Sequence, residues 1–206
     1  MNSKLHELKE LIHNAPQEAL LKSRANVHAD GLYSIVFEGT ENGRLKRAFI
    51  ATKDIDPFDI QLHTHCYPLM LTTLKGSVRH HKAMIRNSLD ANMSIDEYTY
   101  RSALRYGEEA AGLVLEGSRS ISLNDYLLPH GSSIYLKEDD IHTVSCDQGS
   151  IWVVEELGFR TDESKMYGVP FETITMYQSM EHQTKTLMKL WAQLKDAIDF
   201  VTPENL

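Results

Sequence analysis

Residues 59–65 read Asp-Ile-Gln-Leu-His-Thr-His and place two histidines, His63 and His65, two positions apart. In a strand, side chains at positions i and i+2 stand on the same face, so both imidazoles can reach one metal ion. The chain holds ten histidines, and a single pair of this kind arises readily by chance. A metal site therefore needs support from another part of the sequence.

That support comes from His142, far downstream in a segment of similar character. Residues 131–144 run through an apolar strand pattern and a polar turn to His142, which opens another apolar run. A β-barrel can bring such a distant histidine to a shared site. Three neutral imidazoles suit iron, nickel, copper or zinc, whereas magnesium and calcium prefer oxygen ligands. We therefore predict that His63, His65 and His142 bind one divalent transition metal.

The composition favours a single globular domain of 206 residues. Acidic residues outnumber basic ones, 29 to 21, and no basic run follows the sequence, which argues against nucleic acid as a partner. The N-terminus is charged and no apolar stretch is long enough to cross a bilayer, so we expect a cytoplasmic protein with no membrane partner. In that reducing compartment Cys66 and Cys146 are expected to be free thiols.

The periodicity of apolar residues divides this domain into a β-rich centre between two helical ends. We predict an N-terminal helical segment over residues 1–30, a β-barrel over residues 31–160 and a C-terminal helical segment over residues 161–206. The C-terminal segment carries an apolar stripe at helical spacing, which is expected to pack on the barrel or on a partner subunit.

The strands predicted between these ends are short and closely spaced, as in an antiparallel sandwich or barrel. They cover residues 32–38, 44–52, 58–65, 69–74, 77–85, 99–106, 112–116, 120–123, 133–136, 142–144 and 151–155. A hairpin turn is expected at Asn42-Gly43, because this dipeptide accepts the positive φ angles that a tight turn requires. Residues 87–97 are polar and are predicted to form a loop or a short helix.

Both histidine segments resemble the two sequence motifs of the cupin superfamily, which are small jelly-roll barrels that hold a metal inside. The first family motif reads Gly, five residues, His-x-His, three or four residues, Glu, six residues, Gly. The second reads Gly, five residues, Pro-x-Gly, two residues, His, three residues, Asn. The two frames fall on Pro57, His63, His65, Leu69 and Gly76, and on Gly131, Lys137, Asp139, His142 and Cys146.

The match keeps every motif histidine and two turn glycines, whereas the family's Glu is Leu69 and its Asn is Cys146. It covers roughly residues 32–157. The resemblance implies an all-β fold, a cupin-type double-stranded β-helix (jelly-roll) barrel with flanking N- and C-terminal α-helices.

With Leu69 in place of the motif glutamate, three neutral donors remain, so a bound ion keeps its full charge and about three open coordination positions. Three-histidine cupins of this kind resemble iron dioxygenases that act on thiols or β-diketones. The resemblance therefore implies an oxidoreductase, a mononuclear non-haem Fe(II) dioxygenase with a small metal-chelating substrate. Zinc, nickel, manganese and copper are the other candidate ions. Similar cupins are frequently dimers, so a homodimer is expected.

Two other functions stay open. The same motif histidines serve metal-dependent isomerases and lyases, in which the ion acts as a Lewis acid and oxygen is not needed. The third candidate is a cupin that binds a small molecule without turning it over. No DNA-binding helix pair or second domain that would receive such a signal is evident in the sequence.

Residues beside the histidines are further candidates for chemistry. Tyr67 is predicted as a proton donor next to the metal. His80 and His81 lie on one predicted strand, where one ring must point inward and the other outward. We name His80 as the one that contacts the substrate or supports a ligand.

Three carboxylates are candidates for a fourth metal ligand. Two cysteines and His130 also lie near the motifs and are given structural roles. One of Glu155 and Glu156 should face inward by strand parity, although a salt-bridged strand end is the favoured interpretation; Glu116 is another candidate. Cys66 is interpreted as a small core residue and Cys146, on the same face as His142, as barrel packing. His130, between Pro129 and Gly131, is interpreted as a turn residue.

Overall fold

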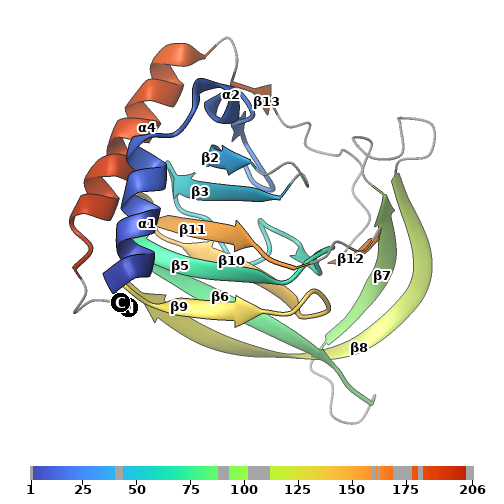
Figure 1. Cartoon of the computed structure of the whole chain (residues 1–206). Coiled ribbons are helices and arrows are strands. Elements are labelled where there is room, and N and C mark those ends of the chain that lie inside the picture. The colour runs from blue at the N-terminus through green and yellow to red at the C-terminus, as the bar shows by residue number, and fades with distance from the viewer. Residues whose placement is uncertain are drawn as a thin grey trace.

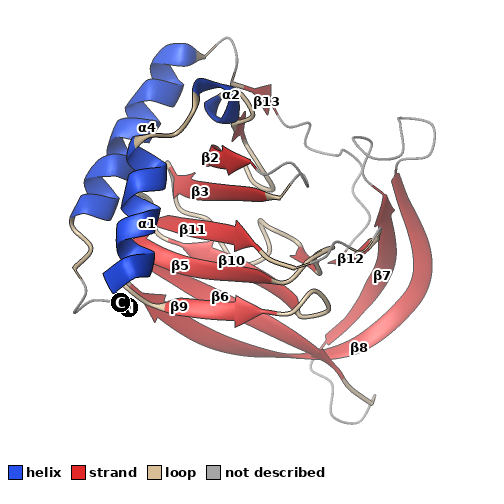
Figure 2. Ribbon diagram, in the orientation of Figure 1, coloured by secondary structure: helices blue, strands red, loops and turns tan. Residues whose placement is uncertain are grey.

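The structure of the protein is a computed structural model, and it describes residues 2–39, 44–87, 93–101, 112–158, 161, 163–168, 178–180 and 183–202. The hairpin turn predicted at Asn42-Gly43 and the strand end predicted over residues 102–106 lie outside the described residues. Figures 1 and 2 show two antiparallel β-layers with helices against one of them.

The first layer is a seven-stranded antiparallel sheet. Its strand order is β13 (Gln178–Ser179), β1 (Arg24–Ala25), β2 (Leu32–Gly39), β3 (Leu45–Ala51), β11 (Ile151–Glu156), β5 (Leu69–Lys75) and β9 (Ser133–Leu136). Strand β11 lies between β3 and β5, and it is buried along its whole length because neighbouring strands and layers cover both of its faces.

The second layer is a set of six strands whose pairings close into a ring. The order around the ring is β10 (Ile141–Cys146), β4 (Leu62–His63), β12 (Ser164–Gly168), β7 (Met93–Arg101), β8 (Gly112–Pro129) and β6 (Ser77–Ile85). Strand β8 is long enough to pair with β6 along one half and with β7 along the other. Figure 1 shows it curving around this side of the molecule.

Within the described residues the strands are flanked by three helices, namely α1 (Asn2–His13), α2 (Gln17–Leu20) and α4 (Thr184–Asp199). Helices α1 and α4 pack on the outer face of the seven-stranded sheet (Figure 2). Leu194 and Ile198 of α4 join Ile12 of α1 in a core with the outward side chains of the sheet, such as Val153. The apolar stripe of the C-terminal segment therefore packs against the barrel, as the sequence predicts.

The inner face of the same sheet meets the second layer in a separate core. This core contains Leu69 and Trp152 from the seven-stranded sheet and Val144 and Cys146 from β10. A third, smaller cluster, which includes Leu62 and Tyr167, fills the inside of the six-stranded ring. The fold class predicted from the sequence is confirmed: the protein is an all-β barrel of the jelly-roll kind with helices at both ends.

The predicted boundaries need several corrections. Only Leu62–His63 of the strand predicted over residues 58–65 is a strand, and residues 57–59 form a turn instead. The loop or helix predicted over residues 87–97 is wrong from residue 93 onward, because Met93–Arg101 forms β7. The strands predicted over 112–116 and 120–123 are one strand, since a continuous ladder with β7 and β6 runs through both.

The chain also uses strands inside its two helical segments. Strand β1 lies within residues 1–30, and β12 and β13 lie within residues 161–206. Strand β12 pairs with β4, which carries His63, so the C-terminal segment completes the wall beside the predicted metal site. Among the residues that the structure describes, no helix has the length and apolar character needed to cross a membrane.

Candidate metal centre

Strand pairing brings two of the predicted ligands together. His63 on β4 is the register partner of His142 on β10, so the two side chains stand side by side on the same face of the ladder. On β10, His142 alternates with Thr143, and its neighbours on the inner face are Val144 and Cys146, whose side chains lie in the barrel core.

His65 reaches the site although it lies just past the end of β4. The backbone N–H of Thr64 donates to the carbonyl of Lys165 on β12 at 2.9 Å, and the N–H of His65 donates to the carbonyl of Glu138 at 3.0 Å. These two bonds fix the chain direction after His63, so the His-Thr-His spacing still converges without a continuous strand.

The three histidines form one cluster. One ring nitrogen from each of His63, His65 and His142 lies within 4.8 Å of the others, and His142 is buried whereas the other two are partly exposed. The Nε2 atoms of His65 and His142 are 2.7 Å apart. Two imidazole nitrogens bound at right angles to one ion, with bonds of about 2.1 Å, would lie about 3 Å apart. The spacing of the donors therefore fits a mononuclear site.

The electrostatics keep these rings neutral, which is the form that binds metal. Burial is the largest cause that holds the pKa of His142 and of His65 well below the usual value, and the neighbouring imidazoles add to it. Burial also lowers the pKa of His63, while a hydrogen bond to the Gln61 carbonyl at 2.7 Å opposes this shift. That carbonyl accepts from Nδ1 of His63, which leaves Nε2 as the ligand atom.

His80 lies directly behind His142. Its Nε2 is 3.0 Å from Nδ1 of His142, and the two rings are stacked with centroids 4.9 Å apart. The side chain is fully buried, and burial, followed by Lys82 and His81, lowers the pKa of His80 to about 4. The inward ring of the His80-His81 pair is thus His80, and it contacts a predicted ligand and no solvent.

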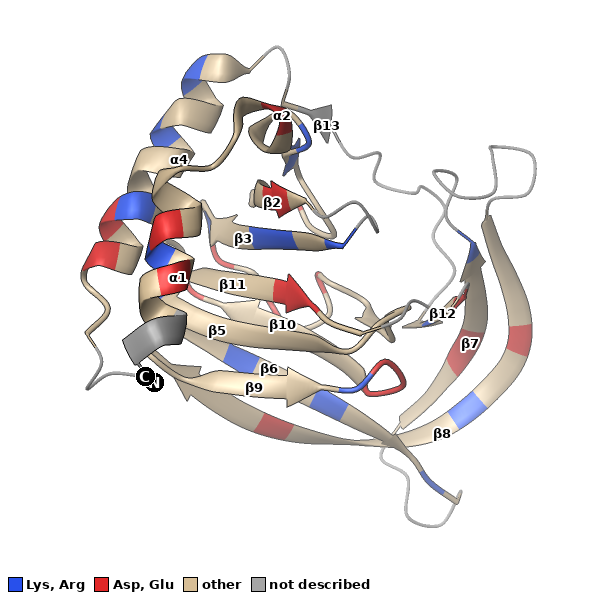
Figure 3. Ribbon diagram, in the orientation of Figure 1, with Lys and Arg blue, Asp and Glu red and all other residues tan. Residues whose placement is uncertain are grey.

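Tyr67 lies against the cluster from the other side. Its ring centroid is 5.8 Å from that of His65, and its hydroxyl oxygen accepts a hydrogen bond of 2.8 Å from Arg47. Arg47 also forms an ion pair with Glu156, whose side chain is 1 % exposed. Figure 3 shows that a basic stretch of β3 lies beside the acidic end of β11.

The inward carboxylate predicted by parity is Glu156, and it does not join the metal cluster. It lies in register beside Leu69, and its oxygens accept from Arg47 and from the backbone N–H of Leu45. Glu155, on the opposite face, lies 4.0 Å from Lys46. Within the described part of the chain, the cluster of candidate ligands contains three histidines and no carboxylate. The salt-bridged interpretation of this strand end is therefore confirmed.

Glu116 and the two cysteines also lie apart from the cluster. Glu116 accepts a hydrogen bond from Thr99 of β7, and its carboxylate lies 3.7 Å from the ammonium of Lys165 on β12. Both cysteines are free thiols, with Cys66 half-buried and Cys146 buried in the barrel core.

The sequence missed one residue at this site. The ring of His28 stacks on that of His63, with centroids 5.5 Å apart and planes 16° apart. Part of the His28 side chain remains accessible to solvent. Desolvation is the largest cause that lowers its pKa well below the usual value, and the nearby His63 and Arg47 lower it further. Its backbone is left-handed, with φ 67°, a conformation that histidine adopts more readily than most residues. A lone histidine before the first long strand gives no periodic signal, so only the turn geometry reveals it.

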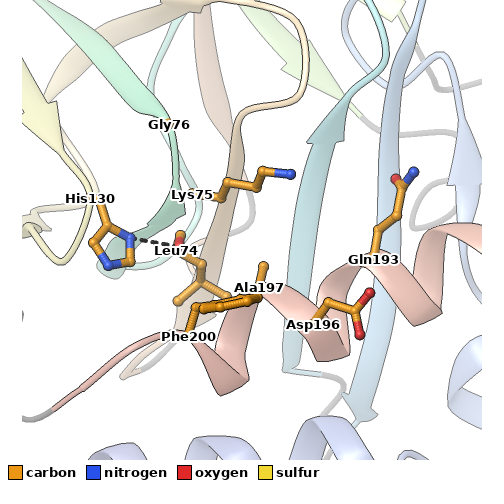
Figure 4. A pocket seen from close by; sticks show the side chains of 8 residues that line it. All are labelled: Leu74, Lys75, Gly76, His130, Gln193, Asp196, Ala197 and Phe200. Carbon is orange, nitrogen blue, oxygen red and sulfur yellow. Dashed lines mark hydrogen bonds between the residues drawn. The ribbon is translucent and has the colours of Figure 1, made fainter.

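A hollow lies outside the barrel, at the C-terminal end of α4 (Figure 4). It is lined by Leu74, Lys75, Gly76, His130, Gln193, Asp196, Ala197 and Phe200. His130 closes one side, where its Nδ1 lies 2.8 Å from the Leu74 carbonyl, in keeping with its predicted role in a turn. Because Leu74 faces the helices, this hollow lies on the opposite side of the sheet from the histidine cluster.

No family profile and no curated protein matches the chain. Among solved structures, hydroxypropylphosphonic acid epoxidase from S. wedmorenis aligns at 16 % identity over 65 % of this chain and 53 % of the epoxidase, with a TM-score of 0.38. A structure described as Fe(II) HppE aligns at 13 % identity over 69 % of this chain and 54 % of that one, with a TM-score of 0.37.

Pac13 of Streptomyces, described as a nucleoside dehydratase with a β-barrel structure, aligns at 10 % identity over 70 % of this chain and 84 % of Pac13, with a TM-score of 0.31. The chain spans about half the length of the epoxidase structures that it matches. We assign the fold of this protein from its own strand pairing and helix positions.

Proposed function

We propose that this chain is a metal-dependent enzyme of the cupin superfamily, a mononuclear non-haem iron dioxygenase that acts on a small metal-chelating substrate. The observation that carries the proposal is the convergence of His63, His65 and His142 with no carboxylate among them in the described residues. A bound divalent ion would supply Lewis acidity and, in the case of iron, one-electron chemistry at several open coordination positions.

The residues around the cluster support such a site in distinct ways. His63 and His65 are partly exposed, so the ligand face is open to a small substrate, whereas His142 closes the inner side. Phe49 and Trp152, with ring centroids 5.4 Å apart, form an apolar wall in the same core, which limits water inside the barrel. Such a wall strengthens electrostatic interactions at the site.

Tyr67 is proposed as the group that handles a proton on the substrate. Its phenol lies beside His65, and the Arg47 guanidinium that donates to its oxygen would stabilise negative charge there. Glu156 balances the charge of Arg47, so the cation does not repel the metal ion with its full charge. The substitution Tyr67→Phe should reduce the turnover number without changing the affinity for metal.

His80 is proposed as a positioning residue for His142. If His142 binds the ion through Nε2, its proton must sit on Nδ1 and be donated to Nε2 of His80. His80 then carries its own proton on Nδ1, a buried atom with no hydrogen-bond partner among the described residues. In the metal-free protein the opposite tautomers are favoured, with His80 donating to His142 and His142 donating to His65.

The effect of His80 on the position of His142 can be measured as a change in metal affinity. We expect His80→Phe to weaken binding of Zn²⁺ or Fe²⁺ by about 10- to 100-fold, as for other substitutions behind a metal ligand. Competition with a chromophoric chelator measures this affinity without any activity assay. His130→Phe is the control, because His130 contacts the Leu74 carbonyl on the far side of the sheet. Equal affinities for His80→Phe and the unmodified protein would rule out the positioning role.

The proposed reaction class is tested by anaerobic purification without chelators, metal analysis, loading with Fe²⁺ and measurement of oxygen uptake with thiols, β-diketones and hydroxy acids. We expect uptake that requires both iron and a chelating substrate and that is lost in His142→Ala. Tightly bound zinc without any oxygen uptake would contradict the proposal.

A second candidate, a metal-dependent isomerase or lyase, is favoured by one observation. A phenol held by Arg47 beside a metal ligand is a proton donor that Lewis-acid chemistry can use without oxygen. Substrate turnover that proceeds at the same rate under nitrogen, with zinc in place of iron, would select this candidate.

A further inference from the structure

The face of β6 and β10 that is opposite the metal site holds a second arrangement of reactive side chains. Nδ1 of His81 lies 2.7 Å from Oδ1 of Asp125, and Nε2 of His81 lies 2.8 Å from Oγ of Ser145. We propose that Asp125, His81 and Ser145 form a nucleophilic relay, with Ser145 able to take an acyl group from a small ester. This site goes beyond the metal-dependent function and does not depend on it.

Strand register builds the relay from three neighbouring strands. Asp125 on β8 is the register partner of His81 on β6, which in turn pairs with Thr143 on β10. Ser145 is two residues along β10 from Thr143 and therefore stands on the same face. His80 and His142 occupy the opposite face of these strands, so the two sites share a sheet but no side chain.

The order of contacts fits the roles in a Ser-His-Asp relay. A carboxylate that accepts from Nδ1–H leaves Nε2 unprotonated, and Nε2 can then accept the proton of the serine hydroxyl. His81 is 4 % exposed and Ser145 is 7 % exposed, so both are held in one geometry by packing. The Asp125 side chain is 48 % exposed, which keeps it hydrated and weakens its effect on His81.

The residues paired with Ser145 across the strands supply a surface for the acyl group. Arg79 is the partner of Ser145 on one side and of Leu127 on the other, and both Arg79 and Leu127 are exposed. A guanidinium beside the serine can stabilise the oxyanion that forms on the carbonyl, and Leu127 offers an apolar contact. Because Ser145 is only 7 % exposed, we expect only small acyl esters to reach its hydroxyl.

The reaction is balanced by the three residues and the ester. Oγ of Ser145 bonds to the carbonyl carbon while its proton passes to Nε2 of His81. The bond between that carbon and the leaving oxygen then breaks, and His81 returns the proton to the leaving alkoxide. Water, activated in the same way, releases the acid and restores the serine. Asp125 stays ionised throughout.

The test uses the full chain with p-nitrophenyl acetate and a small fluorophosphonate as probes, before and after treatment with a metal chelator. We expect a covalent adduct on Ser145 in peptide mapping, equal in both conditions, and no adduct at this peptide in Ser145→Ala. Adduct formation on lysine or tyrosine alone, with the same rate in Ser145→Ala, would overturn the proposal. Because metal binding is measured separately, failure here is distinguishable from failure of the metal centre.

Asp125→Asn provides a second variant at an exposed position, where folding should be unaffected. Its acylation rate should fall by about tenfold, less than for a buried carboxylate because solvent screens Asp125. Asp139→Asn, at an exposed turn on the same layer, is the matched control and should acylate at the unmodified rate. An unchanged rate in Asp125→Asn would show that the three residues are a structural hydrogen-bond chain.

Discussion

Leu69 decides the charge that the barrel wall presents to the histidine cluster. It occupies the position of the motif glutamate, is 2 % exposed and packs with Leu71, Leu136 and Val154 in the barrel core. Its register partner Glu156 is held by Arg47 and is not available to replace it. Apolar packing at this one residue thus leaves three imidazoles and no carboxylate in the candidate ligand set of the described residues.

Introducing the missing carboxylate should destabilise the metal-free protein. We expect Leu69→Glu to lower the free energy of unfolding by roughly 3 kcal/mol or more, because it buries an ionisable group in an apolar core. Leu69→Met, which preserves volume, should cost less than about 1.5 kcal/mol. Urea denaturation without metal measures both. A Leu69→Glu variant as stable as the unmodified chain would show that this position is hydrated.

The two cysteines should differ in reactivity. Burial, then Asp147 and Asp54, raise the pKa of Cys146 to about 12, so at pH 8.5 only about one thiol in a few thousand is ionised. Raising the pH toward 12 increases that fraction, since the thiolate forms only as the pH approaches the raised pKa.

We therefore expect iodoacetamide at pH 8.5 to modify half-buried Cys66 long before Cys146, and denaturant to remove the difference. Peptide mass spectrometry follows the two sites. Equal rates in the folded protein would contradict the buried position of Cys146.

Single residues also show what the sequence could predict at the site. Spacing alone selects His63, His65 and His142, because register pairing turns a motif into a cluster. Spacing could not select His28, which enters through a left-handed turn, nor the pairing of Glu156 with Arg47, which joins separate strands. Parity predicts that one of the two glutamates faces inward but not which partner it finds there.

Among the elements, α4 shows how the spacing of apolar residues in the sequence determines which helix face is buried. Its apolar residues recur at helical spacing and cover the outer face of the seven-stranded sheet, while the other side of the helix faces solvent. The same period that predicts the helix therefore predicts its buried face. The helix begins at Thr184, whereas the helical segment is predicted from residue 161, so the spacing predicts the buried face of the helix better than its start.

This packing leads to a paired test on one helix. Leu194 is fully buried, so Leu194→Ala should reduce the free energy of unfolding by about 2–5 kcal/mol. Met188 is 47 % exposed on the same helix, and Met188→Ala should change it by less than about 0.5 kcal/mol. Thermal or urea denaturation compares the two. Equal effects would mean that α4 is not docked as the structure has it.

Strand ends were harder to predict than strand existence. The residues before Leu62 are apolar and polar in alternation, but a turn at residues 57–59 prevents pairing there. Conversely, β8 continues through Gly117 and its polar neighbours because two partner strands supply a ladder on its edge. Pairing with residues distant in sequence overrides local pattern in both cases.

In the whole molecule, β6 and β10 carry different chemistry on their two faces. The face toward the seven-stranded sheet holds His80 and His142, and the opposite face holds His81 and Ser145. A period of two residues separates the sites completely, because adjacent residues of a strand point in opposite directions. The same strands can thus carry the candidate metal centre on one face and the proposed relay on the other.

The sequence predicts the fold class of this architecture but not the way in which its strands pair. Strands alternating with turns and two helical ends indicate a barrel with flanking helices, which the structure confirms. The closed ring of the second layer depends on β12, which lies in a segment whose pattern predicts helix. The homodimer and the cytoplasmic location expected from the sequence stay predictions.

The central claim is that His63, His65 and His142 bind one ion. X-ray absorption spectroscopy of protein loaded with one equivalent of Fe²⁺ tests it most directly. We predict three imidazole nitrogens at about 2.1 Å from the ion, and two in His142→Ala. A spectrum dominated by oxygen ligands, or one that His142→Ala leaves unchanged, would contradict the account.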